Sequence, residues 1–509
     1  MLGLVLVVAN VDVAGAGTAH LWSKRLGGTD SDHAYSVASD PSGNVLVAGI
    51  SNNSSIDLGG GPLPGVGSFD MVVAKYSASG THLWSKRLGG TGFDYAQSVA
   101  SDPSGNVLVA GYSQSSSIDM GGGPMPGAGR SDMVVAKYSA SGTHLWSKRL
   151  GGTGFDDAQS VASDPSGNVL VAGGSDSSSI DMGGGPLPGV GGMVVAKYSA
   201  SGTHLWSKRL GGTGFDSAQS VASDPSGNVL VAGYSQSSSI DMGGGPLLAS
   251  GFSDMVAGSS DMVVAKYSAS GTHLWSKRIR GTRYDGGTSY DYAQSVASDP
   301  SGNVLIAGFS QSSSIDMGGG PLPGAEWSSD MVVAKYSASG THLWSNRFGG
   351  TDSDYAYSVA SDPSGNVLVA GYSYSSSIDM GGGPLPGAGQ SDMVVAKYVY
   401  VDDNPPASTF HLSPSPRVVS NAASIALTGT ATDDNTGLDS LTVTYINNSS
   451  NAQVVVAASV SCSDGGRLTC TFSAQGPGFP GVWTANARGR DRAGNVESPG
   501  PTVTVVAIP

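Results

Sequence analysis

A near-identical internal repeat dominates this sequence. The tryptophan of a His-Leu-Trp segment recurs at positions 22, 84, 146, 206, 275 and 344, with spacings of 62, 62, 60, 69 and 69 residues. The segments Asp-Pro-Ser-Gly-Asn and Met-Val-Val-Ala-Lys-Tyr each occur six times between residues 19 and 400. Because such repeats stack one small structural unit several times, the fold of one unit decides the fold of most of the chain.

Each unit has four short segments with strand character. In the second unit, residues 97–101 and 107–112 flank the turn 102–106, and residues 133–138 and 143–149 flank the turn 139–142. Proline presets the first turn position and glycine accepts the positive φ that follows, so both pairs are predicted to be hairpins. The Ser/Gly/Pro-rich residues 113–132 between them are predicted to lack regular structure. Four antiparallel strands per repeat predict an all-β propeller blade. A solenoid is the alternative, although its coils are usually much shorter.

The ends of the array predict how the propeller closes. Six copies of the first, second and third strands occur in order, and the last third strand, residues 393–398, has no fourth strand after it. A matching segment, residues 20–26, stands before the first unit instead. If it completes the last blade, two open sheet edges are removed. The sequence therefore predicts six blades closed by an N-terminal strand.

The repeat resembles a known family. Residues 94–99, 102–107 and 109–112, followed by Val134-Val135-Ala136-Lys137 and Leu145-Trp146, resemble the SBBP family of bacterial propeller repeats. The resemblance covers about three quarters of the chain. It implies a secreted or envelope protein of a bacterium, without an assigned catalytic residue. The family is named for seven blades, so seven is the alternative count if the N-terminus is incomplete.

The rest of the chain divides into three parts. Residues 1–18 are interpreted as a leftover strand or a truncated leader, and residues 401–406 as a polar, proline-bearing linker. Residues 407–509 contain short alternating segments at the spacing of an immunoglobulin-like sandwich. Residues 428–435 and 491–495 look like the Ig-like modules of bacterial surface proteins. Cys462 and Cys470 flank a turn, which suits a cross-hairpin disulfide in an oxidising compartment, with two free thiols as the alternative.

Composition excludes several classes of protein. Glycine makes up 77 of 509 residues and charged residues only 13%, which disfavours long helices. The net charge of −14 argues against nucleic acid, whose phosphates attract clustered lysine and arginine. No apolar run reaches the 18 or so residues of a membrane-spanning helix. We therefore expect a protein without a membrane span, and the resemblance to the SBBP family implies a location outside the cell or in the cell envelope.

Three sets of polar residues recur in every unit and invite a chemical interpretation. The histidines could bind metal, but each lies on the fourth strand of its own blade and is interpreted as structural. The aspartates before the first strand could form a ring of cation ligands, but the simpler interpretation is that each caps a turn. The aspartates before the Gly-Gly-Gly-Pro segments lack calcium-loop spacing, so we expect no cofactor and keep calcium only as an alternative. The sets are His20, His82, His144, His204, His273 and His342; Asp32, Asp94, Asp156, Asp216, Asp291 and Asp354; and Asp57, Asp119, Asp181, Asp241, Asp316 and Asp379.

The breaks in the repeat indicate where a specific site could lie. The fourth unit has an insertion near residues 247–258, the connection after it is lengthened, and the fifth unit carries an acidic and an aromatic residue where its sisters have none. All three breaks should lie at one sector of the long-loop face, the end of the blades where the longer connections emerge. Aromatic and arginine side chains are typical of binding hot spots, with drift after duplication as the alternative. The candidate ligand-binding residues are Phe252, Arg280, Arg283, Tyr284, Asp285, Tyr290, Glu326 and Trp327.

These observations favour a non-catalytic, monomeric binding protein. We expect it to present the long-loop face to a glycan, a peptide or a protein partner. One alternative is a polysaccharide lyase or hydrolase, for which Asp285 and Glu326 are the only non-repeated acids available as a pair. The other is a purely structural scaffold.

Overall fold

The computed structural model describes residues 21–189, 191–248, 259–282, 288–324, 328–387 and 389–399, together with the strands between residues 407 and 508. All regular structure in these residues is β-sheet, as the sequence predicts. No helix in this part of the chain has the length and hydropathy of a membrane span. The chain divides into two compact units, Met1–Leu150 and Gly151–Pro509.

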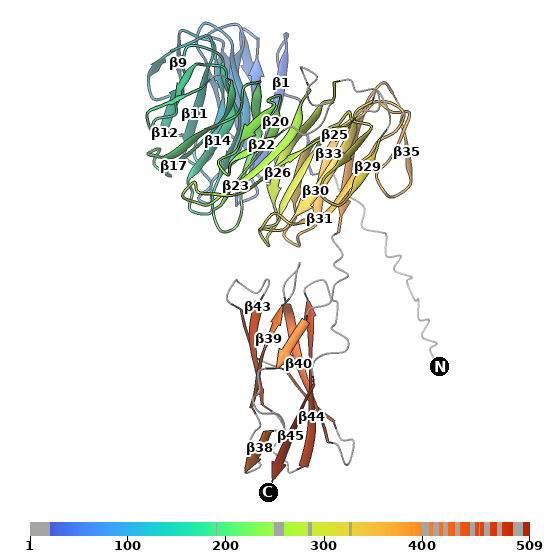
Figure 1. Cartoon of the computed structure of the whole chain (residues 1–509). Coiled ribbons are helices and arrows are strands. Elements are labelled where there is room, and N and C mark those ends of the chain that lie inside the picture. Colours follow the sequence, from blue (N-terminus) through green and yellow to red (C-terminus); the bar gives the residue numbers. More distant parts are fainter. Residues whose placement is uncertain are drawn as a thin grey trace, which may run out of the picture. The chain divides into compact units, whose positions relative to one another are not determined.

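Six repeated antiparallel sheets, numbered one to six along the chain, form most of the described structure (Figure 1). The strands follow one another across each sheet in chain order, except for a small hairpin between the second and third. The first strands are β1 (Asp32–Ser39), β7 (Asp94–Ser101), β13 (Asp156–Ser163), β19 (Asp216–Ser223), β26 (Asp291–Ser298) and β32 (Asp354–Ser361). The second strands are β2 (Val45–Ser51), β8 (Val107–Ser113), β14 (Val169–Ser175), β20 (Val229–Ser235), β27 (Val304–Ser310) and β33 (Val367–Ser373). The third strands are β5 (Asp70–Tyr76), β11 (Asp132–Tyr138), β17 (Gly192–Tyr198), β23 (Asp261–Tyr267), β30 (Asp330–Tyr336) and β36 (Asp392–Tyr398). The fourth strands are β6 (His82–Leu88), β12 (His144–Leu150), β18 (His204–Leu210), β24 (His273–Ile279) and β31 (His342–Phe348).

The two predicted hairpins are present in every complete unit. In sheet five, the Asp299 amide donates to the Asn303 carbonyl at 3.0 Å, and Gly302 lies at a φ of 78°. In the second turn, the Ser337 amide donates to the Thr341 carbonyl at 2.7 Å, and Gly340 lies at a φ of 88°. A side chain other than glycine rarely adopts these left-handed values, which explains why each turn carries glycine at this point.

The connection between the second and third strands corrects a prediction. Residues 113–132 were expected to lack regular structure, but Ser117–Asp119 (β9) and Pro124–Pro126 (β10) form a small antiparallel sheet. Prolines are tolerated in so short an edge strand because they alternate with Met125, which lies opposite Ile118. The Ile118 side chain is buried, and this burial stabilises the small sheet. The equivalent pairs are β3 (Ser55–Asp57) with β4 (Pro62–Pro64), β15 (Ser179–Asp181) with β16 (Pro186–Pro188), β21 (Ser239–Asp241) with β22 (Pro246–Leu248), β28 (Ser314–Asp316) with β29 (Pro321–Pro323) and β34 (Ser377–Asp379) with β35 (Pro384–Pro386).

A β-bulge explains the glycine of each Val-Ala-Gly or Ile-Ala-Gly segment. The pairing of β26 with β27 shifts between Ala293 and Ser295, so one extra residue opposes β27 there. Gly308 faces Ala293, next to the bulge. A Cβ atom at Gly308 would lie 1.8 Å from the backbone oxygen of Tyr292, which is far shorter than any contact that a Cβ atom makes in a folded protein. Glycine is therefore required for the first two strands to pair.

Within each of the two compact units, successive sheets pack against each other through equivalent apolar residues of the repeat. Between sheets four and five, Leu230, Ala232, Met262 and Val264 pack against Ala293, Val296, Val304 and Ile306, and all of these side chains are buried. We call the first group the covering face of a sheet and the second group the receiving face. The same pattern joins sheet one to sheet two and sheet five to sheet six. Within each compact unit, a sheet thus buries one apolar face against the sheet that follows it in the chain.

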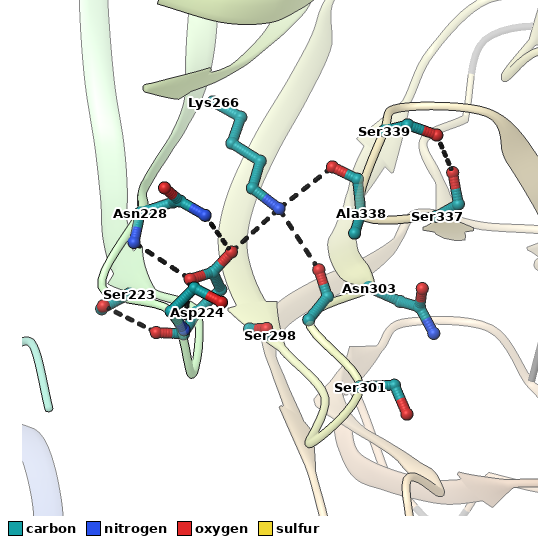
Figure 2. A network of polar contacts seen from close by, with 12 residues as sticks. Ser223, Asp224, Asn228, Lys266, Ser298, Ser301, Asn303, Ser337, Ala338 and Ser339 are labelled. Atoms are coloured by element: carbon teal, nitrogen blue, oxygen red, sulfur yellow. Dashed lines mark hydrogen bonds and ion pairs between the residues drawn. The ribbon is translucent and has the colours of Figure 1, made fainter. Parts of the chain in front are cut away.

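A buried lysine also links sheet one to sheet two, sheet three to sheet four, and sheet four to sheet five, the last of which is drawn in Figure 2. Lys266 Nζ lies 2.9 Å from Asp224 Oδ2 within sheet four, and both side chains are 3% exposed. The same ammonium donates to the Ala338 carbonyl at 3.0 Å and to the Gly302 carbonyl at 3.4 Å, in the two turns of sheet five. The Ala338 carbonyl also accepts the indole N–H of Trp275 at 3.1 Å. Aspartate, lysine and tryptophan of the repeat therefore fasten one sheet to the next.

The aspartate of this lysine link is held in its charged form. Burial of Asp224 opposes ionisation, but hydrogen bonds from Asn228 and Lys266 outweigh it and keep the pKa of Asp224 below its usual value. The same arrangement lowers the pKa of Asp40 to about 2. The Asp-Pro-Ser-Gly-Asn segment therefore closes a turn and also supplies the carboxylate that the lysine requires.

The two ends of the array differ from the interior. Residues 21–26 form no strand in the structure, and His20 lies outside the described residues, so the predicted fourth strand of the last sheet is not observed there. Trp22 makes with sheet one the contact that Trp84 and Trp275 make with the sheet after their own: its indole donates to the Ala78 carbonyl at 3.0 Å, and its ring lies beside Tyr76. Sheet six has three strands in the described part of the chain, in the order β32-β33-β36.

The described strands between residues 407 and 508 form two further sheets. One contains β37 (Ala407–Phe410), β39 (Ala426–Thr432), β43 (Thr469–Gln475) and β42 (Ser459–Cys462). The other contains β38 (Arg417–Ser420), β45 (Thr502–Ile508), β44 (Gly481–Asp491), β40 (Leu438–Asn447) and β41 (Gln453–Ala457). Two sheets of this size are consistent with a sandwich, and its Ig-like character stays a prediction. Cys462 lies directly opposite Cys470 in the register of β42 and β43, which is compatible with the predicted disulfide.

Candidate binding surface

The repeated aspartates before the first strands cap turns, as the simpler interpretation predicted. Asp291 Oδ2 accepts the Gly281 amide and the Ser312 hydroxyl, each at 2.9 Å. The carboxyl group is buried, and this burial raises the pKa of Asp291 to about 6. The same pattern recurs at Asp94, whose Oδ2 accepts the Gly90 amide. These carboxyl groups hold the connection that enters each first strand.

The other two repeated sets also have structural partners. Asp241 Oδ1 accepts the amides of Gly243 and Gly245 at 2.7 and 3.1 Å, which fixes the glycine-rich loop. His273 Nε2 lies 3.0 Å from Ser276 Oγ, and its ring meets Tyr267 edge-on. No group of three or more His, Cys, Asp or Glu side chains in the described ranges is arranged to hold a metal. The histidines and aspartates therefore maintain each sheet.

The raised pKa of Asp291 predicts a pH-dependent difference between the native protein and Asp291→Asn. An unfolded chain releases this proton near pH 4, whereas the folded protein retains it to about pH 6. Raising the pH from 4 to 6 therefore destabilises the native protein relative to the variant, by on the order of 2 kcal/mol. Guanidinium denaturation at pH 4, 5, 6 and 7 measures this change.

Asp224→Asn is the control for that experiment. Because the pKa of Asp224 is lowered, its carboxylate contributes stability above about pH 4 and loses this contribution as the pH falls. Between pH 4 and 7 the stability difference between Asp224→Asn and the native protein should therefore stay nearly constant, whereas Asp291→Asn should gain stability relative to the native protein. Parallel pH profiles for Asp291→Asn and the native protein would contradict the prediction.

Most of the candidate residues from the sequence lie outside the described residues. These are Phe252, Arg283, Tyr284, Asp285, Glu326 and Trp327. Arg280 is half-buried just before Gly281–Thr282 (β25), which pairs with β28, and burial lowers the pKa of its guanidinium. Tyr290 is 37% exposed and stacks on Tyr292 with ring centroids 6.4 Å apart. Of the predicted set, the structure therefore places Tyr290 within a larger aromatic group.

That group is a continuous series of rings across sheets four to six at the long-loop face. Phe215, Tyr234, Tyr292, Phe309, Tyr355 and Tyr372 follow one another with centroid separations of 6.1, 4.2, 5.1, 4.8 and 5.2 Å. Tyr357 and Tyr374 lie 5.5 and 5.4 Å from Tyr372. We call these eight residues, together with Tyr290, the aromatic row.

The strand register positions the aromatic row. Tyr292 lies opposite Phe309, and Tyr355 lies opposite Tyr372, at the start of a first strand and the end of a second strand. Successive sheets bring these cross-strand pairs together, because Phe309 of sheet five meets Tyr355 of sheet six. In sheet three, the same register positions hold Asp157 and Gly174. Aromatic character at these positions is thus a property of particular sheets rather than of the repeat.

The aromatic row is partly exposed and uncharged. Tyr357 and Tyr374 are 49% and 47% exposed, and Phe215 is 44% exposed. Burial raises the pKa of Tyr234 to about 12. The pKa of Tyr372 is also raised, by burial and by a hydrogen bond to Tyr357. These two phenols are therefore neutral at physiological pH, and the row presents ring faces together with hydroxyl groups.

A second aromatic group lies on sheets one and two. Tyr95 stacks on Tyr112 at 4.9 Å, and also lies beside Tyr35 and Phe69. Apart from Tyr290, neither aromatic group was predicted from the sequence, because the candidate residues were taken from the insertions. The sequence signal for both groups lies inside the repeat, at the second residue of the first strand and the sixth residue of the second strand. These positions change among otherwise near-identical copies.

Comparison with known proteins identifies the repeat. The family SBBP, described as a beta-propeller repeat, matches residues 21–57, 83–119, 145–181, 205–241 and 343–379. The chain is a β-propeller repeat protein. The copy that includes the lengthened connection from Arg280 to Tyr290 lies outside the five matched segments.

Two curated proteins are similar over part of their length. The chain is 23% identical over 436 residues to the uncharacterized WD repeat-containing protein L264 of Acanthamoeba polyphaga mimivirus, covering 70% of this chain and 31% of that protein. It is 29% identical over 199 residues to the regulatory protein FlaEY of Caulobacter vibrioides, covering 34% of this chain and 20% of that protein. The chain thus spans a third or less of the length of these relatives.

The following two are among the solved structures that are similar to the chain. A puromycin hydrolase S511A mutant complexed with PGG has a TM-score of 0.27 at 9% identity, over 79% of this chain and 59% of that one. The extracellular domain of the hybrid two-component system BT4673 from B. thetaiotaomicron has a TM-score of 0.15 at 10% identity, over 94% and 76%. Neither TM-score supports an argument about this chain.

Proposed function

We propose that this propeller repeat protein is a non-catalytic binding protein that holds a glycan against the aromatic row. The observation that carries the proposal is a run of neighbouring rings, of which Phe215, Tyr290, Tyr357 and Tyr374 are 37–49% exposed. The apolar C–H face of a sugar ring packs on an aromatic face, and tyrosine hydroxyls bond sugar hydroxyls. A row of rings suits several sugars of one chain better than a single small molecule.

The charge of the row favours a neutral glycan. The aromatic row contains no charged side chain, and the chain as a whole carries a net charge of −14, which disfavours polyanionic ligands. Aromatic side chains also lose little conformational entropy when they bind, because they have only two side-chain torsions. These properties support binding through shape and stacking rather than through ion pairs.

We further propose that the protein acts outside the cell or in the cell envelope. The backbone register that places Cys462 opposite Cys470 supports this location, since a cross-strand disulfide persists only in an oxidising compartment. A surface or secreted position is also where a glycan-binding protein meets its ligand.

The test is a glycan array followed by titration of the best neutral polysaccharide. The double variant Tyr357→Ala/Tyr374→Ala should weaken binding at least tenfold, because it removes the two most exposed rings of the row. Tyr35→Ala is the matched control, since Tyr35 is 47% exposed at the equivalent position of sheet one, and it should bind normally. Trp327→Ala tests the sector predicted from the sequence.

The outcomes separate the alternatives. Equal loss in Tyr35→Ala and in the double variant would place the glycan elsewhere and contradict the role of the aromatic row. Binding to no glycan by the native protein would overturn the proposal and favour a protein partner or a structural scaffold. Cleavage of the polysaccharide during titration would favour the lyase or hydrolase alternative.

A further inference from the structure

The β-bulge of each first strand leaves one residue without a partner on the second strand. In sheet five this residue is Gln294, because the pairing of β26 with β27 shifts between Ala293 and Ser295. The equivalent residues of sheets three, four and six, which we call the bulge residues together with Gln294, are Gln159, Gln219 and Tyr357. A bulge re-aims a side chain, and bulges are over-represented beside functional sites.

The bulge residue lies beside the second residue of its own strand, where sheets five and six have rings of the aromatic row. In sheet six the bulge residue, Tyr357, belongs to the row itself, with ring centroids 6.4 Å from Tyr355 and 5.5 Å from Tyr372. In sheet four, Gln219 Nε2 donates to Ser217 Oγ at 3.1 Å. Ser217 occupies the register position that Tyr355 occupies in sheet six. A glutamine at the bulge therefore reaches the place where the row has its rings.

The first strands of sheets three to six pack side by side, so the bulge residues follow one another from sheet to sheet. The residue after each bulge is a serine, whose hydroxyl accepts the backbone N–H of a valine in the next first strand. These bonds, each 3.1 Å long, join Val221 to Ser160, Val296 to Ser220 and Val359 to Ser295. A line of three glutamines thus leads to Tyr357 and the aromatic row.

The amide groups of this line have unused hydrogen-bonding capacity. The side chains of Gln159 and Gln294 are half-buried and form no hydrogen bond with any residue that the structure describes. Each carries two donor hydrogens and a carbonyl acceptor. Apart from the buried aspartate at its start, none of β19, β26 and β32 carries a charged residue. The glutamines therefore offer uncharged donors and acceptors beside a series of rings.

We propose that Gln159, Gln219 and Gln294 bind hydroxyl groups of the glycan that the aromatic row holds by stacking. This inference rests on the proposed function, and it names the residues that select the ligand. Stacking uses the apolar face of a sugar, whereas a site built to bond a hydroxyl group rejects a ligand that lacks it. The ligand class is a neutral polysaccharide with free hydroxyl groups, long enough to lie along several sheets.

The test compares a neutral polysaccharide from the array with its O-methylated form, in which the modified hydroxyl groups can no longer donate. Gln159→Met/Gln294→Met removes both unbonded amides and keeps the length of each side chain, and Gln219 stays in place because its amide also bonds Ser217. Gln114→Met is the matched control, since Gln114 is an exposed glutamine directly after β8. Titration calorimetry gives the affinity of each protein for both polymers, and thermal denaturation checks that each variant is folded.

We expect the native protein and Gln114→Met to bind the unmodified polymer at least tenfold more tightly than the methylated polymer. The double glutamine variant should bind the unmodified polymer at least fivefold more weakly than the native protein does, and should lose most of this preference. A variant that is weakened equally for both polymers would overturn the inference, since that result indicates a change in structure rather than a lost hydrogen bond.

The inference and the proposed function fail in different ways. Native affinity and native preference in the double glutamine variant, with weak binding by Tyr357→Ala/Tyr374→Ala, would overturn the inference and leave the proposed function standing. A native protein that binds both polymers equally well would do the same. A native protein that binds no polysaccharide would overturn both.

Discussion

Replacing Lys266 with methionine is expected to destabilise the protein by about 3–5 kcal/mol, the range for removing one partner of a buried ion pair. The substitution keeps most of the side-chain volume but leaves the buried Asp224 carboxylate without its cation. It also removes the bonds to the Gly302 and Ala338 carbonyls, which join sheet four to sheet five. Urea or guanidinium denaturation followed by tryptophan fluorescence measures the loss.

Lys397→Met is the matched control for this prediction. It breaks the same lysine–aspartate pair in the last sheet, where the lysine is 53% exposed and solvent can replace the lost interaction. Its denaturation midpoint should stay close to that of the native protein. Equal destabilisation by the two substitutions would show that burial and the bonds to the next sheet contribute nothing.

Gly308→Ala is expected to be at least as damaging, although it adds a single methyl group. The new Cβ would lie 1.8 Å from the Tyr292 backbone oxygen, so β26 and β27 could pair only after the backbone moved. We expect a loss of more than about 3 kcal/mol or a failure to accumulate folded protein, because this overlap involves backbone rather than a flexible side chain. Circular dichroism and thermal denaturation provide the measurement.

Gly382→Ala tests whether that effect comes from the steric overlap. Gly382 lies in a glycine-rich loop of sheet six with no atom within 4 Å of an added Cβ, and its φ is not in the left-handed region. The substitution should leave the thermal midpoint almost unchanged. A comparable loss at both positions would contradict the role assigned to the bulge.

The local structure was largely predictable from the repeat. The two hairpins, their glycines and the four-strand unit follow from the order of turn residues and apolar segments, which act over a few neighbouring residues. The small sheet formed by β9 and β10 was missed, because prolines argue locally against a strand. Burial of Ile118, which depends on the packed protein, outweighed that local preference.

The candidate site was less predictable. Insertions and unusual residues directed attention to the fourth and fifth units. Of the two residues named there that the structure describes, Arg280 and Tyr290, Tyr290 belongs to the aromatic row. Tyr292, Phe309 and Tyr355 lie far apart in the sequence and inside ordinary strands. They form one surface only because the strand register and the packing of successive sheets bring them together.

The sequence by itself determined the β-sheet unit, its turns and its repetition, because turn chemistry and alternating apolar residues are local properties. Only the tertiary structure decided what the repeated lysines, aspartates and tyrosines do. The lysine of one sheet finds two of its acceptors on the next sheet, and the aromatic rings meet across sheets. Those distances depend on how whole sheets pack, and no local pattern of residues encodes them.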